Sequence, residues 1–354
     1  MSVTRRQISR RQAAAGLMTV AGAAMLPALP ALAQGQAPEI EAPEDPDEPA
    51  IAVGAEESRN DHLLAPVTIN GQGPYRFLLD TGANASCVSH RLMDQLALTP
   101  GPPTRVHTVV GVRTRPSVMI DRLQVGARNR RRVRAPALPI RGTEVDGVLG
   151  VDWLKGQRLV LDFKAKNIEI TKSRSDRSED GRVVVPARRR LGQLTIVDAD
   201  LSGERISAMI DSGAHVSLCN APLHRLVVAD ERKRGKLEAP IKLELETLAG
   251  ERFEGELFYL PFLRLGGLHL GNVPVVYADM HVFDIWGLKD TPSIVLGMDL
   301  LTQFDAVALD FGRSQVRFDM SEPQRSADAS RSAASSARIL TNRTEALRTE
   351  STRA

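Results

Sequence analysis

The chain has 354 residues, of which 42% are hydrophobic, and it contains 27 glycines, 21 prolines and two cysteines. This composition excludes a mostly disordered chain and a coiled coil, and so few cysteines exclude a disulfide-stapled miniprotein or a multi-cysteine metal site. Residues 1–33 hold four arginines and no acidic residue, so 42 basic and 43 acidic residues remain and nearly cancel. The charge balance therefore gives no reason to expect nucleic acid as a partner.

The first 33 residues predict an export signal. Arginine pairs occur at 5–6 and 10–11, and the sequence Ser-Arg-Arg-Gln at 9–12 resembles a twin-arginine export motif. Residues 13–33 carry no charge and end in Ala-Leu-Ala, a small-x-small cleavage signal. This uncharged stretch is also long enough to anchor the chain in a bilayer. We expect cleavage, no stable membrane insertion afterwards, and an exported, periplasmic protein.

Residues 34–60 and 321–354 flank the predicted folded region. The first stretch alternates prolines with acidic residues and is expected to be an extended, solvated linker that buries no core. The second stretch is rich in Ser, Ala, Arg and Thr and is expected to be a disordered tail. The fold is therefore expected between residues 61 and 320.

This central region contains an internal duplication. The sequence Asp-Thr-Gly-Ala at 80–83 recurs as Asp-Ser-Gly-Ala at 211–214. Four further landmarks recur in the same order at similar spacings: Thr-x-x-Gly ending at Gly111 and Gly250, Leu-x-x-Gly ending at Gly126 and Gly266, Val-Leu-Gly-Val-Asp at 148–152 against Val-Leu-Gly-Met-Asp at 295–299, and Leu-Asp-Phe at 161–163 and 309–311. The pattern predicts two homologous lobes, at 61–172 and 183–320, joined by a linker at 173–182.

Short apolar or alternating runs bounded by Gly, Pro and Asn predict β-strands in both halves. The runs are 67–69, 75–79, 106–110, 118–120, 159–163 and 168–170 in the first half, and 194–197, 205–210, 241–247 and 273–277 in the second. Asn-Gly-Gln-Gly at 70–73 predicts a hairpin turn, and short helices are expected at 90–96, 152–155 and 298–303. The fold class is therefore all-β with small helices.

The repeated aspartates, Asp80 and Asp211, each end an apolar run and begin a turn. The glycine two residues later has no Cβ, so a backbone N–H can turn towards the carboxylate. The intervening hydroxyl residue, Thr81 or Ser212, can donate to main chain across a symmetry axis. If the lobes pair about an approximate two-fold axis, the two carboxyl groups meet and share one proton. Such a pair can activate a water for attack on an amide carbonyl.

These loops resemble the active-site loops of aspartic proteases, in particular a tandem-repeat, single-chain form of the bacterial retropepsin-like group. The triplets Val-Leu-Gly at 148–150 and 295–297 resemble the strand that supports each loop, and the segments ending at Gly111 and Gly250 resemble the flaps. The resemblance covers about residues 60–320 and implies the acid-protease fold, with two lobes related by a pseudo-two-fold axis. It also implies catalysis by Asp80 and Asp211, with loop support from Thr81, Gly82, Ala83, Ser212, Gly213 and Ala214.

Two positions depart from the family pattern. His215 stands where a small polar residue is usual, and we interpret it as a surface residue; the alternative is an imidazole that shifts the ionisation of the carboxyl groups. The second half is longer at 280–291, which is either a loop over the cleft or packing between the lobes.

Other polar residues receive structural interpretations. Cys87 and Cys219 are expected to be buried thiols on opposite lobes rather than a disulfide. Asp152 and Asp299 are expected to cap short helices. The arginine-rich run at 128–134 is expected to be an exposed, solvated edge.

The expected function is an aspartic endopeptidase whose peptide or protein substrate lies as an extended strand under one or both flaps. The seven histidines show no ligand spacing, so no metal and no cofactor are expected. We expect a monomer whose lobes form an intramolecular pseudo-dimer. One alternative is an inactive peptide-binding or scaffold protein of the same fold. Another is an oligomer in which each half pairs with a second chain.

Overall fold

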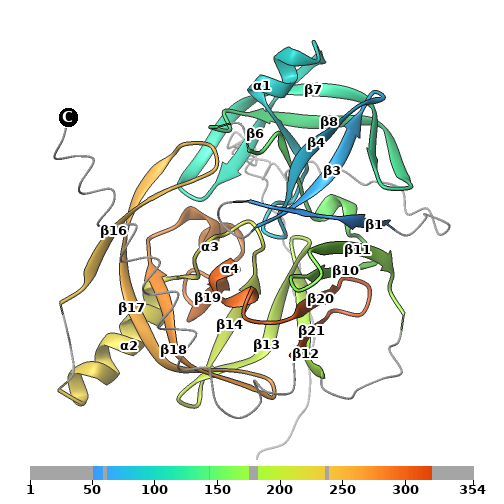
Figure 1. Cartoon of the computed structure of the whole chain (residues 1–354). Coiled ribbons are helices and arrows are strands. Elements are labelled where there is room, and N and C mark those ends of the chain that lie inside the picture. Colours follow the sequence, from blue (N-terminus) through green and yellow to red (C-terminus); the bar gives the residue numbers. More distant parts are fainter. Residues whose placement is uncertain (1–50, 59–61, 143, 175–181, 236–238, 321–354) are drawn as a thin grey trace, which may run out of the picture. The chain divides into compact units, whose positions relative to one another are not determined.

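The computed structural model describes residues 51–58, 62–142, 144–174, 182–235 and 239–320 (Figure 1). The predicted export signal, most of the 34–60 linker, most of the 173–182 linker and the 321–354 tail lie outside these residues. In this described part, none of the helices is both long and apolar enough to cross a membrane. The predicted all-β fold class is confirmed, because strands make up most of the described chain.

The first lobe is a sheet that closes on itself, because β3 pairs with both β4 and β7. Its strands are β2 (Glu56–Glu57), β3 (Leu63–Ile69), β4 (Gln72–Leu79), β5 (Cys87–Ser89), β6 (Thr99–Thr108), β7 (Gly111–Val125), β8 (Arg128–Leu138) and β9 (Gly147–Leu149). The predicted turn at 70–73 joins β3 to β4, and the predicted helix at 90–96 is α1 (His90–Gln95). Helix α1 begins where the Ser89 hydroxyl accepts a hydrogen bond from the Leu92 N–H at 3.0 Å.

The second lobe repeats this closure, because β13 pairs with both β14 and β17. Its strands are β13 (Gln193–Leu201), β14 (Glu204–Ile210), β15 (Leu218–Cys219), β16 (Ile241–Glu246), β17 (Arg252–Leu265), β18 (Leu268–Tyr277) and β19 (Ser293–Leu296). Its helices are α2 (Ala221–Lys233), α3 (His281–Ile285) and α4 (Met298–Leu301). Of the three helices, only α4 was expected. Helix α2 begins at Asn220, whose side chain caps the first turn, and it buries Leu223 and Val227 at helical spacing.

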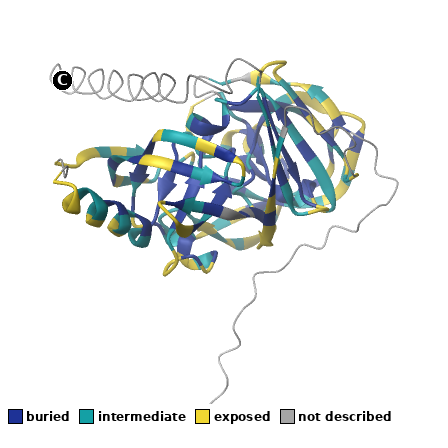
Figure 2. Cartoon of the chain, turned by 90° about the horizontal axis from the view of Figure 1, so that it is seen from below, coloured by how far each residue is buried: buried dark blue, intermediate teal, exposed yellow. Residues whose placement is uncertain are grey.

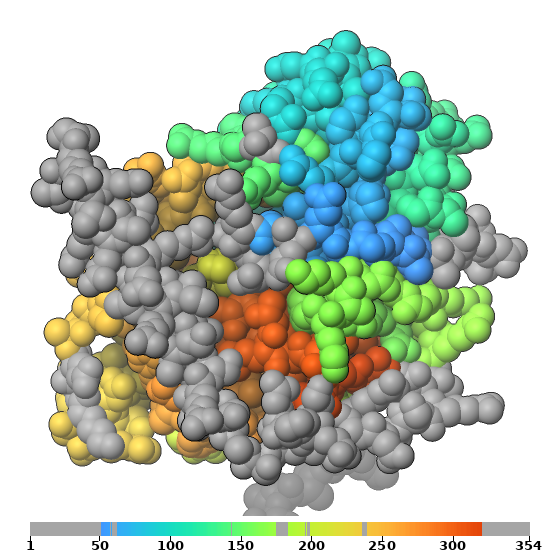
Figure 3. Space-filling model, in the orientation of Figure 1, coloured from blue at the N-terminus to red at the C-terminus, as the bar shows by residue number. Residues whose placement is uncertain are grey.

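The lobes are joined by a shared sheet in the order β1-β11-β10-β20-β21-β12. Its strands are β1 (Ile51–Gly54), β10 (Gln157–Asp162), β11 (Asn167–Lys172), β12 (Arg182–Arg190), β20 (Ala306–Asp310) and β21 (Gln315–Asp319). The central strands β10 and β20 are antiparallel, with Leu159 opposite Leu309 and Leu161 opposite Val307. An approximate two-fold axis between these strands relates one lobe to the other. Segments from the start, middle and end of the described chain lie against one another here (Figure 3).

Strand β1 corrects the predicted linker at 34–60. Its first residue, Ile51, is fully buried and pairs with Ile170 of β11. Ile51 and the partly buried Val53 supply the side chains that this edge of the shared sheet covers, so the last part of the segment is folded. The acidic, proline-rich part before residue 51 lies outside the described residues.

A continuous apolar core runs through both lobes and the shared sheet, and the buried residues follow the strands (Figure 2). The expected exposed edge at 128–134 is wrong at its first residue. Arg128 is 1% exposed, and its guanidinium donates to the Trp153 carbonyl at 3.3 Å. Arg130 lies over the ring of Trp153 at 4.5 Å and donates to the Asp152 carbonyl at 2.6 Å. These two arginines therefore hold the segment that follows β9.

Candidate active site

Asp80 and Asp211 lie at the ends of corresponding strands, β4 and β14. Each strand runs parallel to the one that carries the supporting triplet, β4 beside β9 and β14 beside β19. The Asp80 N–H donates to the Leu149 carbonyl at 2.9 Å, and the Asp211 N–H donates to the Leu296 carbonyl at 3.0 Å. The supporting strands therefore fix the backbone of both aspartates in the same way.

Thr81 and Ser212 are buried and bind the two loops to each other. The Thr81 N–H donates to Ser212 Oγ, and the Ser212 N–H donates to Thr81 Oγ1, each at 3.1 Å. The Thr81 hydroxyl donates to the Ile210 carbonyl at 2.9 Å, and the Ser212 hydroxyl donates to the Leu79 carbonyl at 2.8 Å. The prediction that these hydroxyls bond to main chain across the axis is confirmed.

This arrangement brings the carboxyl groups of Asp80 and Asp211 together, each against the glycine of the opposite loop. Asp80 Oδ1 accepts from the N–H groups of Gly82 and Ala83 at 2.8 and 2.9 Å, and Asp211 Oδ1 accepts from the Gly213 N–H at 2.8 Å. A Cβ on Gly82 would lie 2.5 Å from Asp211 Oδ2, and a Cβ on Gly213 would lie 2.3 Å from Asp80 Cγ. Only glycine leaves room for the opposite carboxyl group at these two positions.

The surroundings of the two carboxyl groups raise the pKa of both. Burial raises the pKa of Asp80 well above its ordinary value, and the charge of Asp211 and the hydrogen bond between the carboxyls raise it further. Burial also raises the pKa of Asp211, but the Gly213 N–H, the hydrogen bond from Asp80 and the Ala214 N–H oppose that rise. Burial raises the pKa of both carboxyl groups, and two carboxyls this close cannot both ionise without a large cost, so the pair can hold a single proton between them.

A serine six residues after each aspartate ties the loop to its supporting glycine. In the first lobe, the Ser86 hydroxyl donates to the Asp152 carboxylate at 2.9 Å and accepts from the Gly150 N–H at 3.1 Å. The second lobe repeats both contacts, at 2.7 and 3.1 Å, with Ser217, Asp299 and Gly297. The equal spacing from the aspartate in both halves is the signal that could have identified these serines from the sequence.

The expectation that Asp152 and Asp299 cap helices is wrong. The residues at the caps are Gly150 and Gly297, and each aspartate lies one position inside its helical turn, where its carboxylate binds the serine. Burial raises the pKa of Asp299 to about 6, against the hydrogen bonds from Ser217. The carboxylates of Asp152 and Asp299 therefore stabilise the aspartate loops through their hydrogen bonds with Ser86 and Ser217.

A second pair of contacts binds each loop to the opposite lobe, and no repeat in the sequence predicts it. His62 Nε2 lies 3.2 Å from the Gly213 carbonyl oxygen, and the Gln193 side-chain amide donates to the Gly82 carbonyl at 2.9 Å. Gln193 also donates to Asn84 Oδ1. His62 and Gln193 are 8% and 1% exposed. Both stand 18 residues before their aspartate, but they differ in residue type, so the repeat does not reveal them.

His215, predicted as a surface residue, lies at the rim of the Asp211 loop with part of its side chain covered. It is half-buried, and its ring centre lies 6.1 Å from that of His62. It follows the Asp211 loop directly, and its carbonyl accepts a hydrogen bond from the Asp299 N–H at 3.1 Å. Burial and the charge of His215 lower the pKa of His62 to about 4, against the hydrogen bond with Gly213.

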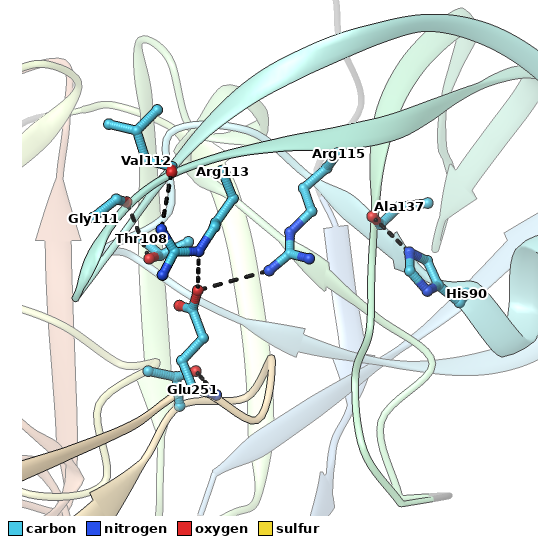
Figure 4. A network of polar contacts seen from close by, with 9 residues as sticks. His90, Thr108, Gly111, Val112, Arg113, Arg115, Ala137 and Glu251 are labelled. Atoms are coloured by element: carbon cyan, nitrogen blue, oxygen red, sulfur yellow. Dashed lines mark hydrogen bonds and ion pairs between the residues drawn. The ribbon is translucent and has the colours of Figure 1, made fainter.

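The two flap candidates lie at the turns of two long hairpins. Gly111 is the first residue of β7 after the turn from β6, and Gly250 lies in the turn between β16 and β17. Glu251, beside Gly250, contacts Arg113 Nε at 3.2 Å and Arg115 Nη2 at 3.7 Å (Figure 4). Ion pairs therefore join the hairpin of one lobe to the hairpin of the other.

The longer segment at 280–291 contacts the first hairpin. The His281 N–H donates to the Val109 carbonyl at 2.9 Å, and the rings of His107 and His281 stack with Nδ1 and Nε2 3.3 Å apart. Val109 also packs against an apolar cluster of the second lobe that includes residues of this segment. The segment therefore packs between the lobes, at the turn of the β6–β7 hairpin.

Cys87 and Cys219 are buried free thiols, as predicted. Burial raises the pKa of both thiols. In the described ranges, no group of three or more His, Cys, Asp or Glu side chains is placed to hold a metal ion.

The comparison with known families agrees with this geometry. A family model described as aspartyl protease matches residues 65–153 and, separately, residues 197–300, which together exceed half of the chain. Each matched segment contains one aspartate loop and one supporting triplet. A search of curated proteins found no match. The chain therefore belongs to the aspartyl protease family, and the double match shows a retropepsin-like form with both halves in tandem.

Proposed function

We propose that the protein is an aspartic endopeptidase that hydrolyses peptide bonds with a water activated by Asp80 and Asp211. The observation that carries this proposal is the close approach of the two carboxyl groups, each beside the glycine of the opposite loop and each held by backbone N–H groups of its own loop. Membership of the aspartyl protease family supports a peptide or protein as the substrate.

In the proposed reaction, a water lies between the two carboxyl groups. Ionised Asp211 accepts a proton from this water as its oxygen attacks the amide carbonyl carbon, and protonated Asp80 donates its proton to the carbonyl oxygen. The tetrahedral intermediate is neutral. It collapses when Asp211 returns a proton to the leaving nitrogen, the C–N bond breaks, and Asp80 recovers a proton from a hydroxyl of the intermediate. The pair ends in its starting state.

The hairpins that carry Gly111 and Gly250 support an extended substrate. Such a peptide would lie as a strand between the two loops and the two hairpin turns, with its backbone bonded to main chain. The contacts of Glu251 with Arg113 and Arg115 hold the turns together, so the hairpins must part before a peptide enters.

The test is cleavage of a peptide library by purified Asp80→Asn and Asp211→Asn variants, with Asp121→Asn, an exposed residue of β7, as the matched control. We expect both site variants to lose cleavage and the control to keep it, with the wild-type activity blocked by pepstatin. Binding of peptides without cleavage by the wild type would favour the inactive peptide-binding alternative.

We further propose that the protein is exported through its twin-arginine signal and acts as a periplasmic monomer. The support is the sequence of residues 1–33 and a chain that already contains both halves of the site. Fractionation of cells that produce the full chain, with the arginine pair at 10–11 changed to lysines as a control, tests export. Sedimentation of the purified protein tests the monomer.

A further inference from the structure

The approximate two-fold axis relates His62 to Gln193. Leu64 pairs with Leu78, two residues before Asp80, and Thr195 pairs with Met209, two residues before Asp211. His62 and Gln193 stand two residues before these paired positions. They therefore occupy corresponding places at the starts of β3 and β13.

His62 and Gln193 each contact the glycine of the aspartate loop in the opposite lobe. His62 reaches the Gly213 carbonyl in the second lobe, and Gln193 reaches the Gly82 carbonyl in the first. Each glycine also donates its N–H to its own aspartate, at 2.8 Å in both loops. A contact with the glycine carbonyl thus fixes the peptide group next to the one that holds the carboxylate.

The two contacts differ in charge. Gln193 is an uncharged amide, and its second partner, Asn84, is also uncharged. His62 instead has His215 as its neighbour, and His215 and Asn84 each stand four residues after their aspartate. The Asp80 loop is therefore contacted by an uncharged amide, and the Asp211 loop by an imidazole that has a second imidazole beside it.

Two imidazoles this close cannot both carry a positive charge without repulsion. His62 is 8% exposed, so water does not solvate its charge. Among the described residues, the titratable side chains of the adjoining segments are Asp80 and Asp211 in the two loops and Asp299, whose N–H binds the His215 carbonyl. The neutral ring, with the proton on Nε2, can donate to the Gly213 carbonyl and carries no such penalty.

We propose that His62 is a positioning residue for Asp211, which holds the Asp211 loop through the Gly213 carbonyl while its ring is uncharged, as the uncharged Gln193 holds the Asp80 loop. His62 touches neither the water nor the substrate in this proposal. It acts through Gly213, and the role in turnover rests on the proposed function. The hold on the loop does not depend on that function.

The lowered pKa of His62 gives the direction of the pH effect. Its value of about 4 in the folded protein lies below the ordinary 6.5 of an unfolded histidine. Between these values the unfolded chain binds a proton at this residue and the folded chain does not. The stability of the folded chain is therefore not reduced by His62 above pH 6.5, and it decreases through this residue as the pH falls from 6.5 towards 4. The folding equilibrium constant falls by about tenfold for each pH unit in that window.

The experiment compares His62→Leu, which cannot donate, with His62→Gln, which copies Gln193, and with His269→Gln, an exposed histidine of β18, as the control. The first readout is kcat and KM for peptide cleavage. We expect His62→Leu to lower kcat by about tenfold or more with a smaller change in KM, and His62→Gln to restore most of that loss. A folded His62→Leu variant with wild-type kcat would overturn the proposal.

Two readouts do not need activity. Hydrogen exchange of the peptide that spans residues 206–218 should speed up in His62→Leu and return towards wild type in His62→Gln. Between pH 6 and 4.5, the folding equilibrium constant of His62→Gln should fall less steeply than that of the wild type, and the difference should be about tenfold per pH unit. The control should fall as steeply as the wild type. Unchanged exchange in His62→Leu, or equal steepness in His62→Gln, would overturn the proposal. A wild type that binds but cleaves no peptide would overturn the proposed function alone.

Discussion

Replacement of Thr81 by valine removes the hydroxyl that binds the two loops and keeps the shape of the side chain. In the wild type, this hydroxyl donates to the Ile210 carbonyl and accepts from the Ser212 N–H. Valine can do neither. Both partners lie at the buried contact between the lobes, where the altered site gives them no replacement.

The magnitude follows from these two bonds. A buried backbone group that loses its hydrogen-bond partner costs about 1–3 kcal/mol, so two such groups predict a loss of about 2–6 kcal/mol in the free energy of unfolding. The matched control is Thr81→Ser, which keeps the hydroxyl and removes one methyl group. Its expected loss is about 1 kcal/mol, the value of one buried CH₂-sized group.

Urea unfolding measures both variants, with Asp80→Asn present in every sample to prevent self-digestion. We expect Thr81→Val to be less stable than Thr81→Ser by at least about 1 kcal/mol. In the active background, kcat/KM of Thr81→Val should fall by about tenfold or more, because the carboxyl groups lose their alignment. If valine and serine at position 81 gave the same stability and the same kcat/KM, the hydroxyl would not hold the loops together.

Two further predictions concern the loops and the hairpins. Gly213→Ala should abolish cleavage, because its Cβ would lie 2.3 Å from Cγ of Asp80, whereas Gly271→Ala, with no atom within 4 Å of the added Cβ, should cleave as the wild type does. Cleavage by Gly213→Ala at the wild-type rate would contradict the close approach of Gly213 to the Asp80 carboxyl group. Glu251→Gln removes the ion pairs between the hairpins, worth about 1 kcal/mol at a partly exposed site, and should change KM by about threefold to tenfold and weaken its salt dependence. Glu254→Gln, at an exposed position of β17, is the control, and an identical response of both variants would count against the contact between the hairpins.

The positions of the two aspartates could be predicted because a duplicated chain repeats its chemistry. A carboxylate, a hydroxyl and a glycine in the same order mark both loops, and each residue type has a local reason that the structure shows. The same comparison of halves shows why other contacts could not be predicted. His62 and Gln193 do the same work with different side chains, so a search for identical residues passes over both.

Context outside the repeat accounts for the remaining differences. Strand β1 follows an acidic, proline-rich segment, and its apolar residues Ile51 and Val53 find a surface to pack against only in the shared sheet. Helix α2 has a cap at Asn220 and buried residues at helical spacing, but the first lobe has only the shorter α1 at the corresponding place. Arg128 is buried because the carbonyl of Trp153 is available to its guanidinium, which no local pattern reveals.

The most direct test of the central claim is the pH dependence of kcat/KM for a peptide substrate. A pair that shares one proton predicts a bell-shaped profile: activity falls at low pH as the pair gains a second proton, and at high pH as the pair loses the shared one. Because the pKa of Asp80 is raised well above its ordinary value, the high-pH limb should lie above the range of an ordinary carboxyl group. A profile with one limb only, or one whose high-pH limb lies within the range of an ordinary carboxyl group, would contradict the shared proton.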